Sequence, residues 1–146
     1  MLIGKYSSKL TNGSRIAVPK KIRDELGAEM IVAKWYENCL VLVSKEHWQD
    51  LIKRLTGEGK LITSPVRDID RFIYGSAYEV VLDFQGRFVL PDSLLKYASL
   101  DDEVEFVGLG DRVEIWSSAR WMDLEKIAEQ NAAKAIDAIS GNKTID

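Results

Sequence analysis

The sequence contains one cysteine, one histidine and no long apolar run, and each shortage excludes a class of protein. With Cys39 alone, the chain can form no internal disulfide and no cysteine-based metal site, so a reducing cytoplasm is the expected compartment. No apolar stretch approaches the ~20 residues that cross a bilayer, and Lys5 and Lys9 are not followed by the apolar segment of a signal peptide. We therefore expect no membrane partner.

The groups that carry catalysis are also scarce. The sequence shows no Ser–His–acid or Cys–His arrangement, no Gly-rich phosphate loop before a helix, and no cluster of metal ligands. His47 is expected at the surface near the start of a helix, and Asp101 and Asp102 in a solvated turn. The sequence therefore predicts a protein that is not an enzyme and has no cofactor, metal site or small-molecule substrate.

Acidic residues are absent from the first 23 positions, although the whole chain carries a net charge of -3. Those positions hold six bases, whereas residues 99–146 hold eleven acids against five bases. Because a polyanion responds to the local field rather than to the net charge, the basic N-terminus favours a nucleic-acid partner. The alternative is a basic face that is simply solvated.

An internal repeat organises the chain. Residues 14–23 read SRIAVPKKIR, and residues 86–95, 72 positions later, read GRFVLPDSLL. Each stretch has an arginine, three mostly apolar strand-forming residues, a proline and a short helical pattern, so Arg15 aligns with Arg87. Each copy is predicted to run strand, turn, strand, short helix, strand, turn, strand and longer helix.

Apolar periodicity, turn residues and helix caps place these elements. The predicted strands cover residues 4–10, 15–18, 30–36, 39–44, about 78–82, 87–90, 103–108 and 112–116. The predicted helices cover residues 20–26, 44–55, 64–73, 91–98 and 118–139, with breaks at Gly57–Gly59 and Gly141. The resulting units are a first repeat (1–57), a linker with the middle helix (58–74), a second repeat (75–125) and a C-terminal helix and tail (126–146).

Four short strands bury too little surface to be stable alone. The two copies are therefore expected to close on each other as one small β-barrel with peripheral helices, a mainly β fold of the α+β class. Closure also leaves few free strand edges.

Two motifs resemble a known family. Asp83-x-x-x-Arg87, within LDFQGRFVLP at residues 82–91, resembles the swapped-hairpin signature of AbrB-type domains. Two such copies, followed by GLGDRVEIW at 108–116 and Arg120-Trp121, are similar to the MraZ family over residues 1 to about 125. The resemblance implies two tandem AbrB-like repeats in one swapped-hairpin, double-psi-like barrel. It also implies a nucleoid-associated regulator that binds promoter DNA of the bacterial cell-division and cell-wall genes as a ring-shaped homo-oligomer.

The two copies differ at the first position of the signature, where Thr11 replaces the acid. Asp83 can form an ion pair that fixes the turn and Arg87, whereas Thr11 can only form hydrogen bonds. Arg15 is therefore expected to be freer to meet a phosphate or a guanine edge, and the first copy is expected to bind DNA. The predicted DNA-binding residues are Arg15, Lys5, Lys9, Lys20, Lys21, Arg23 and Arg87, and the turn-fixing residues are Asp83, Gly13 and Gly86. Six phosphate contacts around Arg15 would give a log–log salt slope of roughly -5.

Two other functions remain open on the sequence alone. One is the antitoxin of a toxin–antitoxin pair, which shares the AbrB-type fold, although two complete copies argue against it. The other is a protein-interaction scaffold that recruits a partner through its acidic C-terminal helix.

Overall fold

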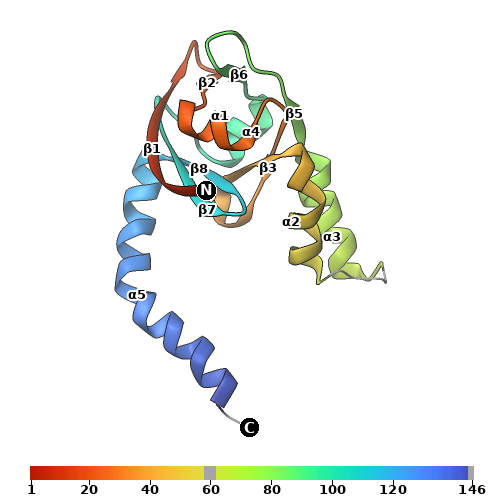
Figure 1. Ribbon diagram of the computed structural model, residues 1–146, viewed down its shortest axis with the longest axis vertical. Helices are drawn as coiled ribbons and strands as arrows, with labels where there is room; N and C mark the ends of the chain where they lie inside the picture. Colours follow the sequence, from red (N-terminus) through yellow and green to blue (C-terminus); the bar gives the residue numbers. More distant parts are fainter. Residues whose placement is uncertain (58–61, 145–146) are drawn as a thin grey trace.

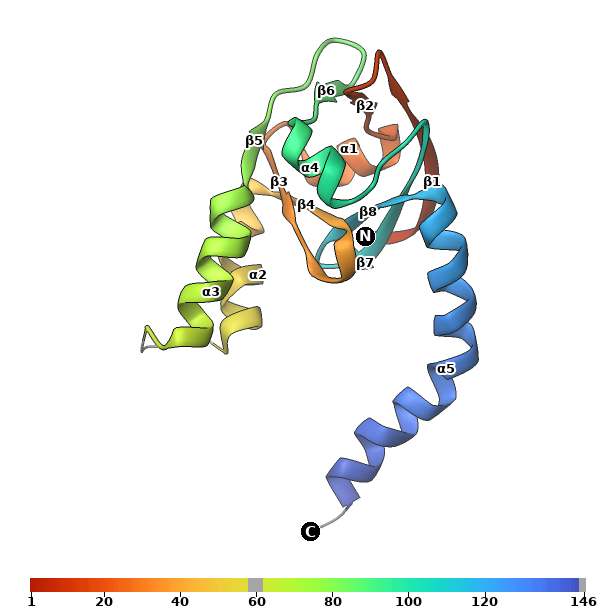
Figure 2. The ribbon, with the colours of Figure 1, turned by 180° about the vertical axis from the view of Figure 1, so that it is seen from behind.

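A computed structural model describes residues 1–57 and 62–144, with side chains to Gly141 (Figures 1 and 2). The strands are β1 (Leu2–Thr11), β2 (Arg15–Ala17), β3 (Met30–Lys34), β4 (Leu40–Ser44), β5 (Tyr78–Val80), β6 (Arg87–Val89), β7 (Glu103–Gly110) and β8 (Val113–Ser117). The α-helices are α1 (Lys20–Leu26), α2 (Trp48–Thr56), α3 (Ser64–Ile73), α4 (Asp92–Tyr97) and α5 (Ser118–Thr144). Short 3-10 turns occupy Tyr36–Asn38, Lys45–His47 and Tyr74–Ser76.

The eight strands form one sheet in the order β5-β3-β4-β8-β7-β1-β2-β6, which curves into a nearly closed barrel (Figure 1). Strands of the two copies are intermixed in this order. The first-copy pair β3 and β4 lies between β5 and β8 of the second copy, and β1 pairs with β7 along its length. The prediction of a single barrel built jointly by both copies, with helices at its periphery, is confirmed.

The two copies of the repeat meet in the antiparallel pair β2 and β6, the last two strands in the sheet order, in which Ile16 stands opposite Phe88. The backbone N–H of Val18 donates to the carbonyl of Gly86 at 2.9 Å, and the N–H of Leu90 donates to the carbonyl of Ser14 at 2.8 Å. These two bonds are equivalent in the repeat, because at the offset of 72 positions Val18 corresponds to Leu90 and Ser14 to Gly86. One chain therefore contains an approximate two-fold axis between its repeats.

Two apolar clusters lie on the two sides of the sheet. The cluster inside the barrel includes Ile16, Leu94 and Phe106, which are fully buried. The second cluster packs α2 and α3 against the outer side of the sheet and includes Trp48 and Trp116. Because β3 and β4 are covered on both sides, their sequences are nearly unbroken apolar runs rather than alternating ones.

Several predicted boundaries differ from the observed ones. The predicted end of the last helix at Gly141 is wrong: α5 continues to Thr144, and a single glycine costs a helix only about 1 kcal/mol. The strand predicted at 30–36 ends at Lys34, because Glu37 and Asn38 both adopt positive φ and turn the chain. Gly57 ends α2 in the left-handed conformation, while residues 58–61, which include the rest of the predicted break, lie outside the described residues.

Candidate nucleic-acid interface

The pair β2 and β6 presents one outward surface, here called the ribbon face, formed by Arg15, Ala17, Arg87 and Val89. Side chains alternate along a strand, so the burial of Ile16 and Phe88 in the barrel turns the arginines outward. Arg15 stands opposite Val89, and Ala17 stands opposite Arg87. The two signature arginines, which are remote from each other in sequence, are therefore diagonal neighbours on one surface.

The turn before β6 is held by the carboxylate of Asp83. Its Oδ1 accepts hydrogen bonds from the backbone N–H of Gln85 at 2.8 Å and of Arg87 at 2.9 Å, and its Oδ2 accepts one from Nε of Arg87 at 3.1 Å. These contacts, led by the backbone N–H of Arg87, lower the pKa of Asp83. The side chain of Arg87 is 24% exposed. The expected ion pair between Asp83 and Arg87 is thus present, and it partly satisfies the guanidinium.

The turn before β2 lacks such a clamp. Thr11 Oγ1 donates to the carbonyl of Arg15 at 3.4 Å, and the N–H of Ser14 donates to the carbonyl of Thr11 at 3.3 Å. Asn12 and Gly13 take positive φ, as the hairpin requires. Arg15 is exposed, and its side chain has no ion pair with the described side chains of residues 1–57 and 62–141. Its charge is therefore uncompensated, in contrast to that of Arg87.

The lysines of the N-terminal segment divide into two groups. Lys9 and Lys21 are exposed and form no ion pair with any part of the chain that the structure describes, although Lys9 stands opposite Glu103 in the β1–β7 register. Lys20 is 3.1 Å from Asp24, one turn along α1, and Lys5 Nζ is 4.0 Å from a carboxylate oxygen of α5. The basic surface is therefore more compensated than the sequence alone indicated.

Arg23 occupies a different environment from the other predicted DNA-binding residues. It is half-buried on α1, and its Nε is buried without a hydrogen-bond partner among the described residues. Its guanidinium lies against Gly86 so closely that a Cβ at that glycine would be 2.6 Å from Arg23 Cζ. Arg23 of the first copy thus packs on the turn of the second copy.

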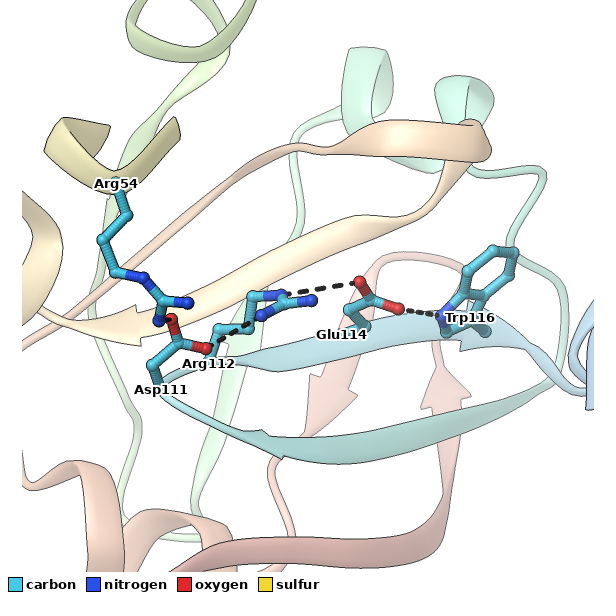
Figure 3. Close-up of polar contacts among 5 residues, drawn as sticks. All are labelled: Arg54, Asp111, Arg112, Glu114 and Trp116. Atoms are coloured by element: carbon cyan, nitrogen blue, oxygen red, sulfur yellow. Dashed lines mark hydrogen bonds and ion pairs between the residues drawn. The ribbon is translucent and has the colours of Figure 1, made fainter. Parts of the chain in front are cut away.

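The sequence reasoning missed a chain of polar contacts at the turn between β7 and β8 (Figure 3). Arg54 of α2 pairs with Asp111, whose other oxygen is 2.8 Å from Arg112 Nη1. Glu114 lies 3.7 Å from Arg112 Nε and accepts a hydrogen bond from Trp116 Nε1 at 3.0 Å. Burial raises the pKa of Glu114. The motif at 108–116 was the available signal, but its partner Arg54 lies far from it in sequence.

No constellation of catalytic groups is evident among the described residues. His47 Nδ1 is 2.8 Å from Ser44 Oγ, a contact that belongs to the 3-10 turn Lys45–His47, which Ser44 caps. Cys39 is buried, and burial raises the pKa of its thiol, which keeps it protonated. The described ranges contain no group of three or more potential metal-ligating side chains and no helix long and apolar enough to cross a membrane.

Comparisons with known proteins agree with the duplicated architecture. The sequence model of a family described as "MraZ protein, putative antitoxin-like" matches residues 1–72 and again residues 73–140. The chain is 37% identical over 142 residues to a protein of Syntrophomonas wolfei named transcriptional regulator MraZ, covering 97% of this chain and 96% of that protein. It is 35% identical over 137 residues to a protein of Clostridium tetani with the same name, covering 89% and 96% of the two chains.

Proposed function

The chain belongs to the MraZ family of transcriptional regulators, and we propose that it acts by binding duplex promoter DNA sequence-specifically through the ribbon face. The observation that carries the proposal is the placement of Arg15 and Arg87 on one exposed surface, with Arg15 unpaired within the described residues. A two-stranded antiparallel ribbon fits the major groove of B-DNA, where an arginine can read guanine through its O6 and N7 atoms.

Roles for individual residues follow from their environments. Arg15 reads a base edge or binds a phosphate, while the exposed Lys9 and Lys21 contact the phosphate backbone and position the protein. Arg87 chiefly holds its turn, with Asp83 as partner. Arg23 supports the same turn, before β6, by packing its guanidinium against Gly86. In this arrangement the first copy supplies the charge, and the second copy completes the barrel.

One modest basic surface per chain is sufficient if several chains are linked. We propose that the protein forms a ring-shaped homo-oligomer in the bacterial nucleoid, whose copies engage repeated elements in the promoter of the cell-division and cell-wall genes. Linking two sites makes the second binding event intramolecular and can raise the overall affinity roughly 10²–10⁴-fold over one site.

An electrophoretic mobility shift series at about 50 and 200 mM salt tests this proposal, with binding-site selection on the purified full chain supplying the duplex. We expect a selected sequence with spaced repeats, and binding that weakens steeply at the higher salt. A folded protein that binds no duplex at the lower salt contradicts DNA binding. A folded, DNA-binding monomer contradicts the ring.

The exposed half of α5 favours a second function as an interaction scaffold. Ile127, Ile136 and Ile139 are 52–63% exposed, and Figure 1 shows this helix leading away from the barrel. In this scaffold function, α5 recruits a partner protein and DNA binding plays no part in the recruitment. Removing residues 127–146 should then abolish recruitment of the partner in pull-down assays and leave duplex binding by the remaining chain unchanged.

A further inference from the structure

The most exposed aromatic side chain in the described structure belongs to the loop that leads into β6 of the ribbon face. Phe84 is 96% exposed in the loop that connects β5 and β6, directly after Asp83. Val81 in the same loop is 82% exposed, and Val89 on the ribbon face is 58% exposed. Exposed apolar side chains that gather in one region, unlike ones scattered singly, mark interaction sites.

The backbone of the turn that carries Phe84 is held by hydrogen bonds of the neighbouring residues. Asp83 accepts two backbone hydrogen bonds across the turn, and the N–H of Gly86 donates to the carbonyl of Asp83 at 3.0 Å. The carbonyl of Gly86 in turn accepts the N–H of Val18 in the first copy. A turn whose backbone is held at both ends loses little backbone entropy when its tip binds.

The approximate two-fold axis shows that this loop is chemically different from its counterpart. The offset of the repeat pairs Val81 with Lys9, and Phe84 with Asn12. Val89 likewise corresponds to Ala17. Figures 1 and 2 show the β1–β2 turn and the β5–β6 loop projecting at the same end of the barrel. One end of the molecule thus carries a polar turn flanked by Lys9 and Arg15 from the first copy, and a loop with the exposed apolar side chains of Val81 and Phe84 from the second.

We propose that Phe84 is a specificity-determining residue that contacts the C5-methyl group of a thymine in the major groove. This inference rests on the proposed DNA-binding function. Apolar side chains, including phenylalanine, distinguish thymine through this methyl group. Phosphate contacts made by the lysines would hold the protein on the duplex, and the apolar turn would add base discrimination without adding charge.

The chemistry of the ribbon face favours duplex DNA over another copy of the chain as the occupant. Val89 is in register with Arg15, whose guanidinium has no ion pair within the described residues. An apolar contact at this position would bring that charge into an interface, where it needs an anionic partner. A duplex supplies phosphates and thymine methyl groups side by side.

Removal of the methyl group alone tests the proposal. The duplex obtained by binding-site selection is synthesised with its thymines replaced one at a time by deoxyuridine, and the affinity of the full chain is measured by fluorescence anisotropy. We expect at least one replacement to weaken binding about fourfold, the effect of exposing one buried methyl group. Phe84→Ala should lose a comparable factor on the thymine duplex and show no further loss on that deoxyuridine duplex.

Matched variants separate this role from charge and from folding. Gln85→Ala changes the adjacent exposed residue of the same turn and should keep the wild-type response to deoxyuridine. Phe84→Ala should also keep the wild-type salt slope, because no charge is removed. Light scattering should give the same mass for both variants as for the wild type.

Three results would overturn the inference. The first is a Phe84→Ala variant that remains as sensitive to deoxyuridine as the wild type. The second is a wild-type affinity that no replacement of thymine by deoxyuridine changes. That result would exclude a methyl contact even if Phe84→Ala weakened binding. The third is a change of mass in Phe84→Ala, which would assign the side chain to a contact between subunits. If the wild type binds no duplex at low salt, the proposed function itself fails and this inference falls with it.

Discussion

Substitution of the two signature arginines should have unequal effects on DNA binding. Of the six bases at positions 1–23, Lys9, Arg15 and Lys21 are exposed and form no ion pair with a described residue. At about -0.9 per phosphate contact, three such contacts give a log–log salt slope near -2.7 for each engaged chain, shallower than the slope of roughly -5 expected for six. Arg15→Ala should reduce that slope by about 0.9 if the arginine binds a phosphate.

Arg87→Ala should leave the slope nearly unchanged, because its guanidinium is already paired with Asp83. The assay is fluorescence anisotropy with the selected duplex between about 50 and 200 mM salt. Lys134→Ala, on the exposed part of α5, removes the same charge far along the chain and should not alter the slope. The assignment of DNA binding to the first copy would be wrong if Arg87→Ala reduced the slope as much as Arg15→Ala did, with both variants folded.

Three further substitutions test the structural account. Gly86→Ala should lower the free energy of unfolding by about 1–3 kcal/mol in urea titrations, because φ is +76° there and a Cβ would meet Arg23; an unchanged midpoint would contradict this packing. Burial raises the pKa of Glu114, so the stability tied to its protonated form is present below the unfolded pKa and is lost as the pH rises through the folded pKa. Glu114→Gln should therefore make the free energy of unfolding in urea vary less between acid and neutral pH. An unaltered pH profile would show that Glu114 does not cause this dependence. Phe106→Ala empties a fully buried site in the barrel and should cost about 3–5 kcal/mol, which thermal unfolding would show as a lower midpoint.

Local chemistry allowed the sequence to predict many elements correctly. The α1 helix begins after Pro19, spans Lys20–Leu26 and ends at Gly27, as its spacing of Ile22 and Leu26 predicts. The Asp83–Arg87 pair was also predictable, because the two residues are only four positions apart and flank one turn. Even the intimate association of the two copies followed from the sequence, since neither has enough strands to form a stable sheet alone.

Other features depend on contacts between segments that are remote in sequence. The sequence distinguishes Arg15 from the other five N-terminal bases but does not distinguish those five from one another. The fold does, because it places Arg23 against Gly86 and brings Lys5 near Glu125. The Arg54–Asp111 pair likewise requires α2 to pack beside the β7–β8 turn. Neither the charge of a residue nor its periodicity specifies such partners.

The amino-acid sequence by itself determined the repeat, the barrel and the difference between Thr11 and Asp83, because each depends on neighbouring residues or on the total apolar surface. The tertiary structure decided which charges remain unpaired, and it placed the β5–β6 loop, which carries Phe84, at the same end of the barrel as the β1–β2 turn (Figures 1 and 2). Those properties arise only when the antiparallel pairing of β2 with β6 joins Arg15 and Arg87 on one surface. Pairing between strands from opposite halves of the sequence is a property of the folded chain, and no local pattern specifies which strands pair. Once β2 and β6 do pair, the alternation that buries Ile16 and Phe88 sets their register.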